Sequence, residues 1–176
     1  DVLEQAEALA LRVVELRRSI LGEEHPLTIN CVVILARIYV QQQLFDKAAP
    51  LTDQALNLSR HLPMENSPFL PWELTVLGWQ YLEQGHVTEA GSLCELALQV
   101  LLRKPDANLL PKPHIVTYLG AVRLAQQKYA EAESFLLRGF QGLQQRQAGI
   151  PAYLSPTRRI GESLERLVQL YDAWGQ

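Results

Sequence analysis

The stretch Leu77-Gly78-Trp79-Gln80-Tyr81 decides how the rest of the chain folds, because it recurs at a fixed step. A similar stretch, Leu35-Ala36-Arg37-Ile38-Tyr39, lies before Leu77 in the chain. Another, Leu119-Gly120-Ala121-Val122-Arg123, begins equally far after Leu77. A further copy, Leu167-Val168-Gln169-Leu170-Tyr171, follows after a slightly longer step. Small residues follow the first three copies at matching positions: Ala48 and Ala55, Ala90 and Ala97, Ala132 and Gly139. Equal steps with matching residue types indicate an internal repeat.

The segments between these copies have the pattern of amphipathic helices, and no strand-like alternation appears. Gly22 and Pro26 end the first helical segment, Thr28 and Asn30 open the second, and Thr88 is the expected N-cap of the fifth. About eight antiparallel helices are therefore expected in a single domain. Its parts are a half repeat over 1–22, repeats over 27–62, 69–104 and 112–146, and a half repeat over 157–174.

The small residues explain why these helices would pair. Gly78 on the first helix of a repeat and Ala90 on the second would let the two helices approach closely. One helix pair cannot bury its apolar face alone, so several pairs have to stack into a continuous core.

This pattern of Leu-Gly-x-x-Tyr followed by two alanines resembles the tetratricopeptide repeat. The long period, with Leu21-Gly22-Glu23-Glu24-His25-Pro26 between units, is similar to the kinesin-light-chain type. The family's second-helix aromatic is replaced here by Thr52, Cys94 and Leu136. The resemblance implies an all-α fold, a right-handed α-α superhelix.

Composition narrows the classes of partner and the compartment. The 176 residues include 16 basic and 19 acidic side chains, which leaves no basic stripe for nucleic acid. No apolar run reaches the roughly 18 residues that a membrane span requires. The two cysteines, Cys31 and Cys94, form no disulfide framework and are expected to be small buried residues of a cytoplasmic protein.

No motif supports an enzyme, a cofactor or a metal site. The histidines at 25, 61, 86 and 114 never stand at the i, i+4 spacing of a helical metal site, and no pair of cysteines accompanies them. The glycines are isolated at repeat or turn positions, so no phosphate-binding loop is present. The chain is therefore expected to be non-enzymatic.

A second apolar stripe runs along the fourth helix beside the core stripe. In tetratricopeptide solenoids the first helices line the concave surface, so the resemblance places this stripe in a peptide-binding groove. The expected groove residues are Asn30, Val33, Ile34, Arg37, Trp72, Thr75, Val76, Trp79, His114, Thr117 and Tyr118. The alternative is that Trp72 and Trp79 pack against the loop at Pro68 and Pro71.

The function expected from this groove is a scaffold that binds a protein or peptide segment through apolar anchors. The alternative is a regulatory or sensor region of a larger protein that packs against its own neighbouring domain. Ala6 aligns with Ala48, so the chain begins at a second helix and ends on a first helix. We expect either a piece of a longer protein or a solenoid with half-unit ends, and the apolar end faces predict self-association.

Overall fold

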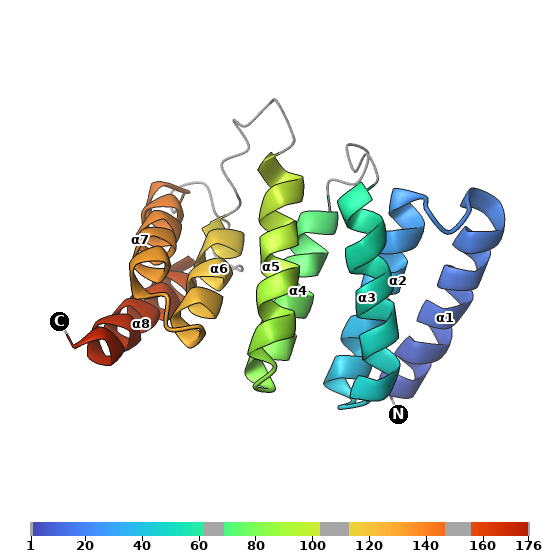
Figure 1. Ribbon diagram of the computed structural model, residues 1–176, viewed down its shortest axis with the longest axis horizontal. Helices are drawn as coiled ribbons and strands as arrows, with labels where there is room; N and C mark the ends of the chain where they lie inside the picture. Colours follow the sequence, from blue (N-terminus) through green and yellow to red (C-terminus); the bar gives the residue numbers. More distant parts are fainter. Residues whose placement is uncertain (1, 62–68, 103–112, 147–155, 176) are drawn as a thin grey trace. The chain divides into compact units, whose positions relative to one another are not determined.

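The computed structural model describes residues 2–61, 69–102, 113–146 and 156–175. Within these ranges the chain forms eight helices and no strand, so the all-α prediction is confirmed (Figure 1). The helices are α1 (Val2–Leu21), α2 (Pro26–Gln41), α3 (Phe45–His61), α4 (Leu70–Glu83), α5 (Val87–Leu102), α6 (Pro113–Ala125), α7 (Tyr129–Arg146) and α8 (Pro156–Trp174).

Two helix starts differ from the sequence expectation. Helix α2 begins at Pro26, not at Thr28, because proline at the first helical position loses no hydrogen bond and already has a helical φ. The His25 side chain caps this helix, since its Nδ1 accepts a hydrogen bond of 3.2 Å from the Leu27 N–H. Helix α5 begins at Val87, so Thr88 lies inside its first turn and is not the N-cap.

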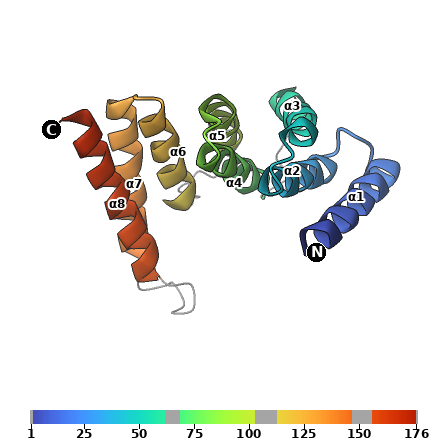
Figure 2. The ribbon, with the colours of Figure 1, turned by 90° about the horizontal axis from the view of Figure 1, so that it is seen from below.

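The chain divides into two compact units, Asp1–Pro105 and Asp106–Gln176. The first unit holds α1 to α5 and the second holds α6 to α8. In the first unit, α2 packs beside α4 in one layer and α3 packs beside α5 in the other (Figure 2). Helix α1 packs against α2.

The helix pairs α2–α3, α4–α5 and α6–α7 turn in the same way at the same repeat position. Residues Gln43, Gly85 and Gln127, which stand at equal steps along the chain, have positive φ angles of 60°, 84° and 58°. The N–H group of the residue that follows each of them bonds to the carbonyl five residues earlier, on Tyr39, Tyr81 or Arg123, at 2.9 Å. This pattern is the Schellman motif, which satisfies helix carbonyls that would otherwise lack a partner.

The predicted close approach at the small residues is present in both units. A Cβ atom added to Gly78 would lie 2.9 Å from the Cys94 Sγ and 3.2 Å from the Ala90 carbonyl oxygen. A Cβ atom on Gly120 would lie 2.6 Å from the Leu136 Cγ. These distances leave no room for a methyl group, so glycine sets how closely the two helices of a pair can pack.

The core of the second unit joins α7 to α8. Ala132 and Leu136 on α7 pack with Leu167 and Leu170 on α8. At the edge of this core the Tyr129 and Trp174 rings stack with centroids 5.9 Å apart.

Candidate protein-binding surface

Six of the predicted groove residues lie on α2 and α4 and are partly buried. They are Asn30, Ile34 and Arg37 on α2, and Trp72, Val76 and Trp79 on α4. The three residues on each helix follow the i, i+4, i+7 spacing of one helix face. The two sets occupy the same positions in successive repeats and α2 packs beside α4, so the six residues share one side of the layer. We call this surface the α2/α4 face.

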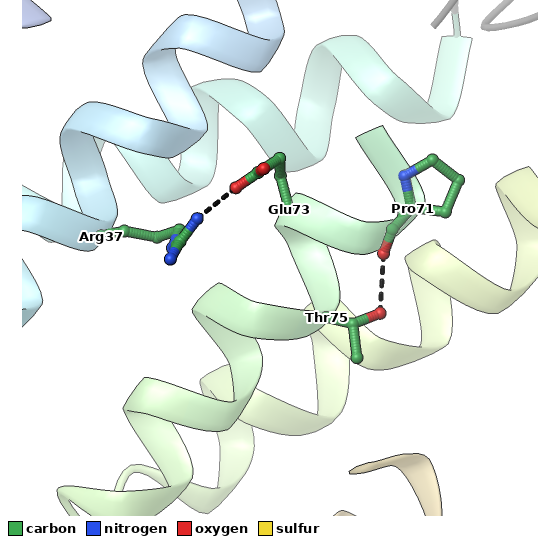
Figure 3. Close-up of polar contacts among 4 residues, drawn as sticks. All are labelled: Arg37, Pro71, Glu73 and Thr75. Carbon is green, nitrogen blue, oxygen red and sulfur yellow. Dashed lines mark hydrogen bonds and ion pairs between the residues drawn. The ribbon is translucent and has the colours of Figure 1, made fainter. Parts of the chain in front are cut away.

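Three predicted groove residues do not belong to an open surface. Val33 and Thr75 have no exposed area, and Thr117 is buried as well. They occupy the same position in successive repeats, one residue before Ile34 and Val76 in the first two. The Thr75 hydroxyl donates a hydrogen bond of 2.7 Å to the Pro71 carbonyl, so this polar group is satisfied within its own helix (Figure 3). The sequence placed these three residues in the groove, and their burial corrects this prediction. Each of the three side chains packs in the interior.

The remaining predicted groove residues, His114 and Tyr118, lie on α6 in the second unit. Tyr118 is partly buried, and the guanidinium carbon of Arg166 on α8 lies 5.9 Å from its ring centroid. The His114 side chain lies outside the described residues. A space shared by Trp72, Trp79 and Tyr118 therefore stays a prediction.

The alternative position for the tryptophans, against the loop at Pro68 and Pro71, stays a prediction. Pro71 is buried within the first turn of α4, and Pro68 lies outside the described residues. Trp72 and Trp79 both have contacts with other groups. Both tryptophan residues are partly buried, so a part of each remains accessible.

An ion pair that the sequence analysis missed lies on the α2/α4 face. The Arg37 guanidinium of α2 bonds to the Glu73 carboxylate of α4 (Figure 3). Both side chains are partly buried, which reduces the screening of their attraction by water. The sequence did contain a signal for this ion pair, because α2 and α4 are the first helices of consecutive repeats and carry side chains of opposite charge. Helix periodicity alone, however, did not place Glu73 beside Arg37. The pair joins the two helices and neutralises the charge of the face.

This pairing limits the chemistry that the face can perform. A clamp for a terminal carboxylate requires cationic groups that are available to the ligand, and the Arg37 guanidinium already binds Glu73. Among the described residues, the Asn30 Oδ1 and Gln80 Oε1 atoms are buried acceptors without a hydrogen-bond partner. The face thus offers apolar and aromatic area with a few neutral polar groups.

His86 and the two cysteines lie among packed side chains. The His86 ring packs on Phe45 with centroids 4.5 Å apart and on Tyr81 at 5.7 Å. The Tyr81 hydroxyl lies 3.0 Å from the Thr52 hydroxyl, and burial raises the pKa of Tyr81 above its usual value. Cys31 and Cys94 are buried, as predicted, and neither is part of a disulfide. The described residues contain no cluster of three or more potential metal ligands. None of the described helices has the length and apolarity of a membrane span.

Comparisons with known proteins agree with the repeat analysis. Residues 2–27 match the family model described as tetratricopeptide repeat. No curated protein matches the chain. Among solved structures, BtubC (BKLC) from P. vanneervenii has a TM-score of 0.68 at 22% identity, covering 98% of this chain and 67% of its own.

A putative kinesin light chain from Podosopora anserina with nearly identical TPR-like repeats is similar as well. It has a TM-score of 0.67 at 21% identity and covers 99% of this chain and 80% of its own. A point variant of that protein has a TM-score of 0.68 at 21% identity, with 99% and 79% coverage. At these identities the likeness establishes the fold. Together with the match at residues 2–27 to a tetratricopeptide-repeat model, it shows that the chain has a helical-repeat fold similar to that of kinesin-light-chain-like repeat proteins.

Proposed function

We propose that the chain is a non-enzymatic scaffold that binds a protein segment on the α2/α4 face. The fold supports a protein-interaction scaffold in general. The observation that carries the finer proposal is the pair of partly buried indoles, Trp72 and Trp79, on a face whose charges are neutralised internally. Large aromatic side chains in partly enclosed positions dominate the binding energy of many protein interfaces.

The chemistry of this face favours a ligand with apolar anchors. Ile34 and Val76 add aliphatic area beside the indoles. A segment that presents two or three apolar side chains along one edge fits this surface better than an acidic tail does. The same face would serve a neighbouring domain of a longer polypeptide, which is the regulatory alternative.

The proposal also includes the cellular compartment in which the protein acts. Both cysteines are buried and neither forms a disulfide, which is usual for proteins of a reducing compartment. We therefore assign the scaffold to the cytoplasm.

The test begins with peptides selected from a random library on the wild-type chain. Their affinities are then measured by titration against Trp79→Ala, Trp72→Ala and Asn57→Ala. The tryptophan changes should weaken binding by about 2 kcal/mol or more, because each removes an aromatic anchor. Asn57, an exposed residue of α3, is the control and should leave the affinity unchanged. Lys47 is unsuitable as a control, because it pairs with Glu7 and lies over the Tyr39 ring.

Thermal melts of each variant separate binding from folding. A Trp79→Ala protein that melts like the wild type and keeps every selected peptide would contradict the proposal. A Trp79→Ala protein that unfolds would assign this indole to the core.

A further inference from the structure

Helix α4 carries two apolar stripes, and only one of them is buried inside its unit. The residues of the inner stripe are at most 2% exposed: Leu70, Leu74, Leu77 and Tyr81. The outer stripe consists of Phe69, Trp72, Val76 and Trp79. Phe69 directly precedes the helix, has a helical backbone with φ −92° and ψ −20°, and is 60% exposed. The other three are partly buried and form the α4 half of the α2/α4 face.

The outer stripe has the spacing of a surface that packs against another helix. Its residues are separated by three, four and three positions, and Glu83 follows after four more. Alternation of three and four positions keeps side chains on one line along a helix, and two helices pack side by side through such lines. From Phe69 to Glu83 the line is about 21 Å long, since each residue rises about 1.5 Å. A partner helix of about four turns would cover it.

An extended segment matches this stripe less well than a helix does. The side chains of an extended segment alternate between two faces, so one face offers an anchor only about every 7 Å. An extended segment also brings backbone N–H and C=O groups that need partners on the protein. On this face, however, Arg37 and Glu73 bond to each other, and the Thr75 hydroxyl bonds within its own helix. A helix satisfies its own backbone groups and requires only apolar area.

The stripe ends on an exposed acidic group. Glu83 lies one turn after Trp79 on the same side of α4. No ion pair among the described residues includes Glu83. Glu83 is also the last residue of α4, where the negative end of the helix dipole favours a nearby cation. Its counterpart on α2 is the neutral Gln41, so this end of the α2/α4 face is complementary to a positive charge.

We propose that the outer stripe of α4 binds an amphipathic helix of a partner protein, and that a lysine or arginine beyond the apolar face of this helix pairs with Glu83. The inference rests on the proposed function, because three of the four apolar residues belong to the α2/α4 face. It adds the conformation of the bound segment and the sign of its charge. Glu83 is then a specificity-determining residue, whereas the aromatic residues supply the affinity.

The first test concerns the conformation of the ligand. The probe is a library of alanine-based peptides of about 18 residues, a length that allows a helix to form in water. Apolar residues are randomised at the three-and-four spacing, and a lysine stands one turn beyond them. Peptides selected on the wild-type chain are then titrated beside versions with a proline on the solvent-facing side. Proline breaks the helix and leaves the apolar residues unchanged, so the affinity should fall at least about tenfold.

A charge exchange tests the contact with Glu83. Each selected peptide is compared with a version that carries glutamate in place of the lysine. The wild type should prefer the lysine version about fivefold, less at high salt, and Glu83→Lys should prefer the glutamate version. Because Glu83 is exposed, circular dichroism of Glu83→Lys should show unchanged helix content. Asp53→Lys is the matched control, since Asp53 is an exposed acid on α3 and its reversal should keep the wild-type preference.

Trp79→Ala distinguishes a failure of this inference from a failure of the proposed function. If Trp79→Ala loses the selected peptides but the proline versions bind the wild type as well as their parents do, the α2/α4 face binds extended segments and the helix proposal is wrong. A lysine preference that persists in Glu83→Lys would overturn the proposed charge pair. Peptides that bind Trp79→Ala as tightly as the wild type would contradict both proposals, and a library that yields no ligand would overturn the helix proposal as well.

Discussion

At the residue scale, two glycines are required by contact distance. A methyl group on Gly120 would meet Leu136 at 2.6 Å from Cγ and 3.1 Å from the backbone nitrogen. We predict that Gly120→Ala lowers the free energy of unfolding by about 1–3 kcal/mol through overpacking, although alanine has the higher helix propensity. Chemical denaturation measures this change.

A double-mutant cycle with Leu136→Ala tests the origin of that loss. Leu136→Ala alone removes a buried side chain and should cost about 2–5 kcal/mol. The double variant should cost clearly less than the two single changes together, since the new methyl group occupies space that Leu136 left. Additive costs would show that the helices do not meet at these two residues.

Two glutamines at the helix-pair turns have a backbone conformation that suits glycine. Gln43 and Gln127 have positive φ, as Gly85 does at the same repeat position. We predict that Gln43→Gly and Gln127→Gly each raise the free energy of unfolding by about 0.5–1 kcal/mol, because glycine avoids the left-handed penalty. Gln41→Gly, two positions earlier in the same glutamine run and at the end of α2, should lower it. A decrease for Gln43→Gly would mean that this turn is not left-handed.

At the scale of the element, the ion pair between Arg37 and Glu73 controls the charge that α2 and α4 present. We predict that Glu73→Gln makes the Arg37 guanidinium available, and that affinity for acidic peptides then rises about tenfold. Affinity for apolar peptides should change little. The measurement is a titration with two peptides that share their apolar anchors and differ in acidic residues. Arg37→Gln combined with Glu73→Gln is the control, and it should return both affinities to similar values.

The stability of the variant gives a second measurement of the same pair. Loss of one partner leaves a partly buried charge without its partner, so Glu73→Gln should also lower the melting temperature slightly. An unchanged melting temperature with unchanged peptide selectivity would show that the pair does not form in solution.

At the scale of the whole molecule, the division into two units predicts independent folding. Residues 1–105 contain α1 to α5 and the complete α2/α4 face. We predict that this fragment folds alone, with a cooperative thermal transition and a helical circular dichroism spectrum. It should also keep the peptides that depend on Trp79. A folded fragment that loses these peptides would indicate that α6 contributes to binding, and an unfolded fragment would contradict the division.

The amino-acid sequence by itself determined the helical repeat and the pairing of the helices. Both are local or periodic properties: residues such as Leu77, Gly78 and Ala90 recur at fixed steps, and one face of each helix has to be buried. The close approach at Gly78 followed from residue size alone. The turn position also followed from the period, although the left-handed backbone of Gln43 did not, because glutamine gives no signal of positive φ.

The tertiary structure decided which apolar side chains remain available. Periodicity assigns Val33 and Ile34 to overlapping stripes of one helix, and only the neighbouring helices decide that Val33 is buried and Ile34 is partly exposed. The contact between Arg37 and Glu73 likewise depends on the distance between α2 and α4, which no local pattern encodes. The division into two units has the same origin, since it depends on contacts between elements far apart in the chain. Local patterns specify what each helix can bury, and the packed arrangement decides what each helix does bury.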